Sequence, residues 1–318
     1  MTTYKEIRGT NIEAVASDPS NPVEGQVWYN TTTNVVKGLT INPGSWATGD
    51  NLNTTRNNGG LAGAGTQTSA LAFGGYDPNP ANTETYNGTS WTEVNDLNTA
   101  RGYLAGSGAS NTAALAFGGE SPLVALTESW NGTNWTAVNN LNTAIGKQAG
   151  CGTNTAALSF GGSPGPTAHT ELWNGTNWTE VGNLNTARRF LAGAGISTSA
   201  LAFGGDTSPE TQTELYNGTN WSNVNSMNTG RDQLGGCGAN NTSALAFAGG
   251  PTPAGPTTKN STETWNGTNW TTVANTSVEA VKLAGAGTKA LGLKIGGKNV
   301  NSTEEFSSGP TTVTFDVS

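Results

Sequence analysis

Residues that carry acid–base, metal and redox chemistry are scarce in this sequence of 318 residues. It contains one histidine, His169, and two cysteines, Cys151 and Cys237. A histidine-based metal site needs several imidazoles, and a Ser-His-Asp triad needs a histidine beside its nucleophile, so neither has enough material here. We therefore expect no catalytic residues, no metal site and no cofactor, and we predict that the protein is not an enzyme.

Charge is also scarce, and its balance is acidic. Only 11% of the residues are charged, and 14 Lys and Arg against 22 Asp and Glu give a net charge of −8. Nucleic acids and anionic membranes attract proteins with clustered basic residues, whereas the basic residues here are few and scattered. We expect neither nucleic acid nor a membrane among the partners of this protein.

Long apolar runs are absent as well. No stretch approaches the ~20 consecutive apolar residues that a membrane-spanning helix needs. The opening residues, MTTYKEIRGTNIEAV, lack the apolar core of a secretory signal peptide. We expect a protein made in the cytoplasm and not inserted into a membrane. That expectation bears on the tripeptide Asn-Gly-Thr, which recurs five times and would accept a glycan only in a secretory pathway.

Glycine and tryptophan are abundant, with 45 and 10 copies. A low-charge, glycine-rich chain can be disordered, but these tryptophans recur at a fixed spacing, which indicates a folded repeat. A Gly-Gly doublet ends a run such as ALAFGG every 43 to 47 residues. The first glycines of the doublets are Gly74, Gly118, Gly161, Gly204, Gly249 and Gly296.

Several other residues recur in register with the doublet. The repeated glutamates are Glu84, Glu128, Glu171, Glu214, Glu263 and Glu304, each followed two residues later by an aromatic residue. The repeated tryptophans are Trp46, Trp91, Trp135, Trp178, Trp221 and Trp270. The repeated arginines are Arg56, Arg101, Arg188 and Arg231, with Ile145 at the same position in one unit. We interpret the glutamates and arginines as structural contacts between repeats. Contacts that hold every repeat in place use the same residue in each repeat, whereas a selective binding site uses residues that differ between repeats.

Each repeat resolves into four short strands. In the first repeat these are LAGAG, SALAFGG, TETY and SWTEV, and the second alternates large and small residues, as in a sheet covered on both faces. Asn87-Gly88 lies between the third and fourth strands, where Asn-Gly predicts a type I′ hairpin turn with positive φ at both residues. We therefore interpret the repeated sequon as turn chemistry and not as a glycosylation site.

Four strands repeated every 40 to 50 residues are typical of an all-β fold, the β-propeller. The runs ALAFGG, TETYNGTSW and LNTAR resemble the kelch repeat, and the resemblance covers residues 45–306. We expect residues 1–44 to form an N-terminal segment that anchors or closes the ring, and residues 45–318 to form a kelch-like propeller. The last repeat departs from the pattern, because Phe306 is followed by neither Asn-Gly nor tryptophan.

Closure of the ring has two solutions. Six Gly-Gly strands and six Trp strands favour six blades, in which the Trp46 strand becomes the outer strand of the last blade. In the alternative, TTVTFDV supplies that outer strand, and GQVWYN, VVKGLT and SWAT build a separate element or part of a seventh blade.

Cys151 and Cys237 occupy one repeat position, which holds alanine or serine in the other repeats. A buried position for a small side chain suits a free cysteine, and the third and fifth blades are not neighbours, so we expect two free thiols. His169 lies in a loop, where we interpret it as a solvent-facing residue.

The segments between the Gly-Gly doublet and the glutamate differ from repeat to repeat. Variable, proline-containing loops on a repeating scaffold suit selective recognition. We expect them to share a face with the links between blades. Our candidate contact residues are Tyr76, Asp77, Leu123, His169, Glu210 and Lys259.

The segment EAVASDPSNPVEGQVWYNTTTNVVKGL resembles part of tail and appendage proteins of marine bacteriophages, over residues 7–46. The resemblance implies a structural protein of the virion, a tail-associated or decorating appendage that attaches to the host. Its partners would be other virion proteins and a host-surface glycan or protein receptor, with a homo-oligomer also open. Two other classes stay open: a free carbohydrate-binding propeller lectin and a kelch-type scaffold for protein interactions.

Overall fold

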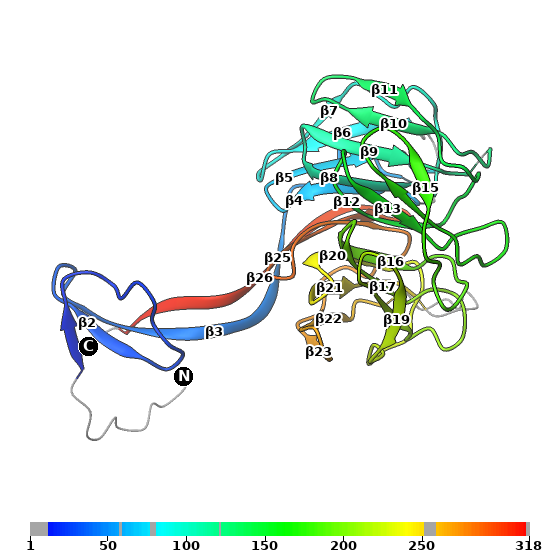
Figure 1. The fold of residues 1–318 in the computed structure, drawn as a ribbon. Helices are drawn as coiled ribbons and strands as arrows, with labels where there is room; N and C mark the ends of the chain where they lie inside the picture. The colour runs from blue at the N-terminus through cyan, green and yellow to red at the C-terminus, as the bar shows by residue number, and fades with distance from the viewer. Residues whose placement is uncertain (1–11, 57–58, 77–80, 121, 251–258, 316–318) are drawn as a thin grey trace. The chain divides into compact units, whose positions relative to one another are not determined.

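The computed structural model describes residues 12–56, 59–76, 81–120, 122–250 and 259–315, and in these residues all regular structure is β-strand (Figure 1). The chain divides into two compact units. Unit 1 consists of Met1–Pro43 and Ser308–Ser318, and unit 2 of Gly44–Ser307. Residues 308–318, which we included in the propeller, thus group with the N-terminal segment. In the described residues, no helix has the length and apolar character needed to cross a membrane.

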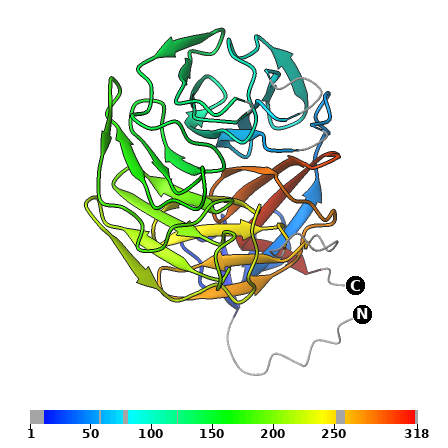
Figure 2. The ribbon, with the colours of Figure 1, turned by 90° about the vertical axis from the view of Figure 1, so that its right-hand side faces the viewer.

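Unit 2 is a six-bladed β-propeller of four-stranded antiparallel blades, seen around its centre in Figure 2. Blade 1 contains β4 (Ala62–Thr66), β5 (Ser69–Phe73), β6 (Thr83–Tyr86) and β7 (Trp91–Val94). Blade 2 contains β8 (Ala105–Ser110), β9 (Ala113–Phe117), β10 (Thr127–Trp130) and β11 (Trp135–Val138). Blade 3 contains β12 (Ala149–Gly152), β13 (Ala157–Phe160), β14 (Thr170–Trp173) and β15 (Trp178–Glu180).

The remaining blades repeat this arrangement. Blade 4 contains β16 (Ala192–Ile196), β17 (Ser199–Phe203), β18 (Thr213–Tyr216) and β19 (Trp221–Val224). Blade 5 contains β20 (Gly235–Asn240), β21 (Ser243–Phe247), β22 (Thr262–Trp265) and β23 (Trp270–Val273). Blade 6 contains β24 (Ala284–Gly287), β25 (Leu291–Gly297) and the unit 2 parts of β26 (Val300–Phe315) and β3 (Val35–Thr48). The four-stranded repeat and the all-β propeller predicted from the sequence are confirmed.

The ring is closed by the strand that carries Trp46. In blade 6 the strand order is β24, β25, β26 and β3, so the N-terminal β3 is the outermost strand. The Trp46 ring packs on Phe306 of β26, with ring centroids 5.2 Å apart. The preferred closure is confirmed. The alternative is wrong for the outer strand, because residues 311–315 continue β26. Its separate element is found in part, because GQVWYN and VVKGLT lie in unit 1, whereas SWAT belongs to β3 of blade 6.

The second strands of the blades form the core. In β5, Ala70, Leu71, Ala72 and Phe73 are all fully buried, because neighbouring blades cover both faces of the strand. The first strands lie innermost and pack closely on one another. A Cβ at Gly106 would lie 2.6 Å from the Phe73 ring and 3.1 Å from the Gly63 carbonyl oxygen, so this close packing requires glycine.

The Asn-Gly segments join the third and fourth strands as expected, but the predicted type I′ turn is wrong. Gly88 has a φ of +89°, whereas Asn87 is absent from the positive-φ residues of the described chain. The Asn87 side-chain oxygen accepts hydrogen bonds from the Thr89 and Ser90 N–H groups, both at 2.9 Å. This asparagine-capped four-residue loop needs left-handed backbone only at the glycine, because the side-chain oxygen takes the place of a backbone acceptor.

Unit 1 is organised around Asp18. It contains β1 (Glu13–Val15), parallel to β2 (Val27–Asn30), which is antiparallel to the first part of β3. The Asp18 carboxylate accepts hydrogen bonds from Lys37, Asn30 and the buried Trp28, at 2.8 to 3.0 Å. The Lys37 hydrogen bond, followed by the other two, lowers the pKa of Asp18 to about 2.

Candidate functional site

Each blade is bonded to the preceding blade by one tryptophan. The indole N–H of a tryptophan in the outer strand donates to the hydroxyl of a buried threonine in the preceding blade's third strand, at 2.9 to 3.2 Å. The six pairs are Trp46–Thr262, Trp91–Thr303, Trp135–Thr83, Trp178–Thr127, Trp221–Thr170 and Trp270–Thr213. The repeated tryptophans therefore hold the ring together and are not surface binding residues.

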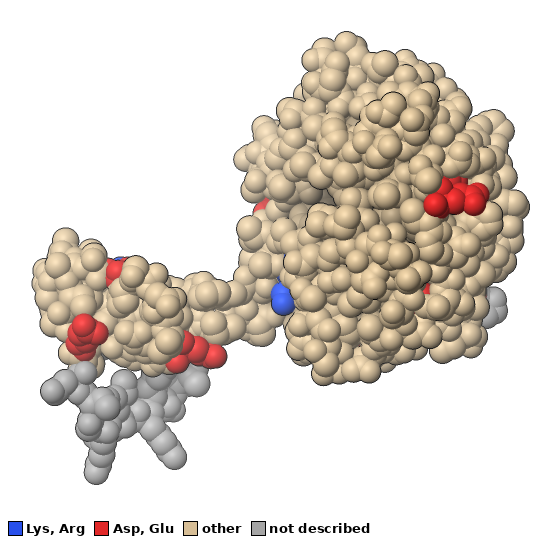
Figure 3. Space-filling model, viewed as in Figure 1, with Lys and Arg blue, Asp and Glu red and all other residues tan. Residues whose placement is uncertain are grey.

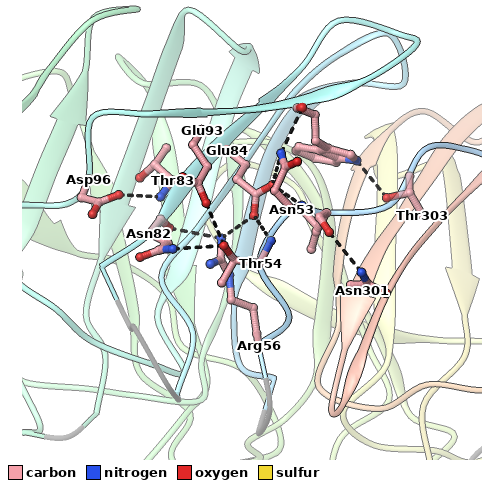
Figure 4. A network of polar contacts seen from close by, with 12 residues as sticks. Asn53, Thr54, Arg56, Asn82, Thr83, Glu84, Glu93, Asp96, Asn301 and Thr303 are labelled. Carbon is pink, nitrogen blue, oxygen red and sulfur yellow. Dashed lines mark hydrogen bonds and ion pairs between the residues drawn. The ribbon is translucent and has the colours of Figure 1, made fainter.

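The repeated glutamates bind the links, the segments that run from the outer strand of one blade to the first strand of the next. The Glu84 carboxylate accepts hydrogen bonds from the backbone N–H groups of Asn53 and Thr54, and from the Asn53 side chain, at 2.7 to 3.2 Å (Figure 4). Arg56 pairs with the same carboxylate at 3.2 Å. The corresponding pairs are Arg101–Glu128, Arg188–Glu214 and Arg231–Glu263, each at 3.2 Å.

Two blades replace the arginine differently. In blade 6 the equivalent position is Ala280, and a buried lysine of β25, Lys294, pairs with Glu304 at 2.8 Å. In blade 3 the position is Ile145, and within the described residues Glu171 has no ion-pair partner. Glu171 keeps hydrogen bonds from Asn142 and the Thr143 N–H at 2.8 to 3.1 Å. The backbone donors therefore recur in every blade, whereas the cation does not.

The two cysteines lie on the innermost strands of blades 3 and 5, and both are free and buried. Burial raises the pKa of each thiol to about 12. Their sulfurs face the backbone carbonyl oxygens of Ile196 and Thr288, at 3.9 and 3.5 Å. The prediction of free thiols in non-neighbouring blades is confirmed.

The propeller has two different faces. On what we call the loop face, the links between blades meet the loops that join second to third strands, as shown by the isolated bridges Gly102–Glu120 and Gly146–Ser163. On the turn face, Thr68 of a tight turn lies beneath Gly88 of an Asn-Gly loop. The turn face repeats the same short sequences, whereas the loop-face segments differ from blade to blade.

A closed ring of backbone hydrogen bonds surrounds the channel at the loop face. Six link residues, one from each junction between blades, each donate an N–H to the carbonyl oxygen of the preceding one, at 2.7 to 2.9 Å. All six have positive φ, between 51° and 71°. They are Gly60, Tyr103, Lys147, Phe190, Gln233 and Lys282. We call this set the channel mouth. Its backbone is six-fold regular, but its side chains are not.

The channel mouth combines ammonium groups with aromatic rings. Lys147 Nζ lies 5.6 Å from the Tyr103 ring centroid and 5.4 Å from that of Phe190, and it pairs with Glu120 at 2.8 Å. Lys282 Nζ lies 5.1 Å from the Tyr103 centroid and donates to its hydroxyl at 2.5 Å. Burial, together with the nearby Lys147, lowers the pKa of Lys282. These side chains border a cavity of about 80 Å³.

Of the predicted contact residues, Tyr76 lies beside the channel mouth. Tyr76 is 41% exposed, and its ring centroid is 5.5 Å from that of Tyr103. The others stand on different blades: Leu123 and His169 are exposed, Glu210 and Lys259 are half-buried, and Lys259 Nζ donates to the Gly230 carbonyl. Asp77 lies outside the described residues.

The channel-mouth residues are not among the contact residues predicted from the sequence. The sequence carries a signal for them, because this position reads Gly, Tyr, Lys, Phe, Gln and Lys in the six repeats, whereas the residue after it is leucine in five of them. The loops were chosen as candidate contacts because their residues vary from repeat to repeat, and this position varies in the same way.

Charged side chains are widely separated on the face of unit 2 shown in Figure 3. Groups of three or more metal-ligating side chains are absent from the described part of the chain. In the comparisons with known proteins, neither a model of a protein family nor a curated protein matches this chain.

Proposed function

We propose that this protein is a non-enzymatic structural protein of a bacteriophage virion, a tail-associated or decorating appendage. In this proposal unit 1 attaches to other virion proteins, and the loop face of unit 2 binds a host-surface glycan, a receptor or another partner. The blades are kelch-like in this proposal, because Gly-Gly, glutamate and tryptophan keep their spacing.

The observation that carries the proposal is the contrast between scaffold and loop face. The same Trp–Thr and Glu–link contacts recur around the ring, and a closed backbone ring holds the channel mouth. Side chains of different chemistry, such as Tyr103, Lys147 and Gln233, are then presented on that regular backbone. Recognition residues held by a rigid scaffold lose little conformational entropy when a ligand binds.

Unit 1 supports the attachment role. It is compact in its own right, and the links and loops of the propeller belong to unit 2. The segment that resembles phage tail proteins contains β1, β2 and most of β3. Between β2 and β3, the Asn30 side-chain oxygen accepts hydrogen bonds from the Thr32 and Thr33 N–H groups and so caps the NTTT turn.

The surroundings of the histidine and of the two thiols, together with the small cavity, support a non-enzymatic protein. The one histidine is exposed on a loop, and the two thiols are buried with raised pKa values, so they are not poised as nucleophiles. The cavity of about 80 Å³ at the channel mouth is far below the roughly 300–1,000 Å³ of ligand pockets.

A lectin with one identical site per blade is less well supported. Such sites need an exposed aromatic residue repeated in each blade, whereas the repeated aromatics of the third strands are buried. They are Tyr86, Trp130, Trp173, Tyr216, Trp265 and Phe306.

Mass spectrometry of purified virions, combined with electron microscopy of virions labelled with an antibody against the propeller, tests this function. The proposal expects the protein in intact particles, with the label on the tail or on a surface appendage. Presence in infected cells but absence from purified particles would contradict it.

A further inference from the structure

The channel mouth contains two lysines whose ammonium groups have different surroundings. Lys147 is paired with a carboxylate, Glu120, which also accepts a hydrogen bond from Ser163 at 2.6 Å. Lys282 instead has the neutral Tyr103 hydroxyl as its hydrogen-bond acceptor. An ammonium group has three donors, so Lys282 can bind a further acceptor that approaches the mouth.

A ligand of limited size is indicated for the cavity itself. A volume of about 80 Å³ admits a small anionic group and its waters but not a drug-sized molecule. A larger ligand would therefore lie across the loop face and insert one charged group between the lysines. Tyr76 and Phe190 would border such a ligand, because Tyr76 is exposed beside Tyr103 and Phe190 completes the rim.

Electrostatics disfavours a polyanion with closely spaced charges. Arg189 at the rim is neutralised by Asp206, and Lys147 by Glu120, while the whole chain carries a net charge of −8. A nucleic acid needs an extended basic surface. A saccharide with a carboxylate on some of its residues needs only one cationic position, and its apolar C–H faces pack on exposed aromatic rings.

We propose that the channel mouth binds a carboxylate-bearing saccharide, with Lys282 holding the carboxylate and Tyr76 packing against the sugar ring. This inference rests on the proposed recognition function of the loop face and specifies its ligand class. Gln233 presents a half-buried side-chain amide at the same mouth, which suits the hydroxyl groups of a sugar.

The test is calorimetric titration of the full chain with tetragalacturonate, with maltotetraose as the neutral counterpart and sodium acetate as the bare carboxylate. The inference expects binding of tetragalacturonate only. It expects Lys282→Gln and Tyr76→Ala each to weaken that binding at least about tenfold. Lys282→Gln keeps the fold intact, because glutamine already occupies the equivalent position at residue 233. The matched control, Lys289→Gln in the turn between β24 and β25, should bind as the unaltered protein does.

Other outcomes overturn the inference. These are no binding of tetragalacturonate, equal binding of maltotetraose, equally strong binding of acetate, or an unaltered affinity of the Lys282→Gln variant. If the protein is found in virions and binds host cells but gives one of these results, the proposed function stands and the proposed ligand is wrong. If it is absent from virions but binds tetragalacturonate specifically, the ligand stands and the virion function is wrong.

Discussion

Trp91 of blade 1 donates its indole N–H to Thr303 of blade 6, at 2.9 Å, although 212 residues separate them in the chain. This bond is chemically the same as the five that join consecutive blades. Since Trp46 of β3 makes the equivalent bond to Thr262 of blade 5, both junctions of the closing blade repeat the rule of the ring. The ring is therefore closed by the same Trp–Thr hydrogen bond that joins the other blades, at both junctions of blade 6.

Loss of this hydroxyl should destabilise the ring. Thr303→Val keeps the side-chain shape but leaves the buried indole N–H without its acceptor, which costs about 1–3 kcal/mol. Urea unfolding followed by tryptophan fluorescence measures the loss. Thr92→Val, at an exposed position of β7, is the control and should change the stability by less than about 0.5 kcal/mol. Equal effects of the two substitutions would contradict a stabilising role of the Trp–Thr hydrogen bond.

The two partners of a buried ion pair should not be equivalent. Glu214→Gln leaves Arg188 as an unpaired buried cation and should cost about 3–5 kcal/mol. Arg188→Ile should cost less, because Glu214 keeps the donors of Asn185 and the Thr186 N–H, the arrangement that blade 3 has at Ile145. Denaturation curves of both variants compare these costs. A larger loss for Arg188→Ile would show that the cation is the main stabilising partner.

The Asn-Gly loop should depend on its glycine. Gly88 has a φ of +89°, and an added Cβ would lie 3.1 Å from Cβ of Thr68. Gly88→Val should destabilise the protein by roughly 1–3 kcal/mol, since a β-branched residue resists positive φ. Thermal unfolding of this variant and of Thr89→Val, in the same loop but with ordinary backbone, checks the expectation. An unaltered melting temperature for Gly88→Val would refute the loop geometry.

The buried thiols should make the protein sensitive to alkali. In the unfolded chain the thiols ionise near pH 9, whereas burial raises their pKa to about 12 in the fold. The folded state therefore holds more protons above pH 9, and stability should fall as pH rises from 9 towards 12. At pH 10 the loss is on the order of 1 kcal/mol per thiol.

The double variant Cys151→Ala, Cys237→Ala should show a shallower decline in this range, measured by unfolding at pH 8 and pH 10. Alanine occupies the position at Ala64, Ala194 and Ala286, so the variant should fold normally. Unaltered cysteines should react with a thiol reagent only after denaturation. An identical pH dependence of both proteins, or rapid labelling of the native protein, would contradict buried thiols.

The sequence predicted the propeller because its repeats are local. Gly-Gly, Glu and Trp recur within single blades, and their spacing alone gives four strands and the Trp46 closure. The Asn87 turn type could not be obtained this way, because a side-chain hydrogen bond replaced the backbone geometry that Asn-Gly usually adopts.

Contacts between distant residues were also beyond the pattern. The exchange of a link arginine for Lys294 in blade 6 joins two positions that never pair in the other blades. The channel mouth is assembled from six links about 40 to 50 residues apart, and its position is defined only once the ring closes.

Binding to host cells tests the division between the two faces most directly. Labelled full-length protein would be competed from host cells by two unlabelled variants of unaltered stability. One carries Tyr76→Ala and Lys282→Gln on the loop face, and the other carries Thr68→Ser and Lys289→Gln on the turn face. We predict that the turn-face variant competes as well as the unaltered protein and that the loop-face variant competes at least about tenfold more weakly. Equal competition by both variants would contradict recognition through the loop face.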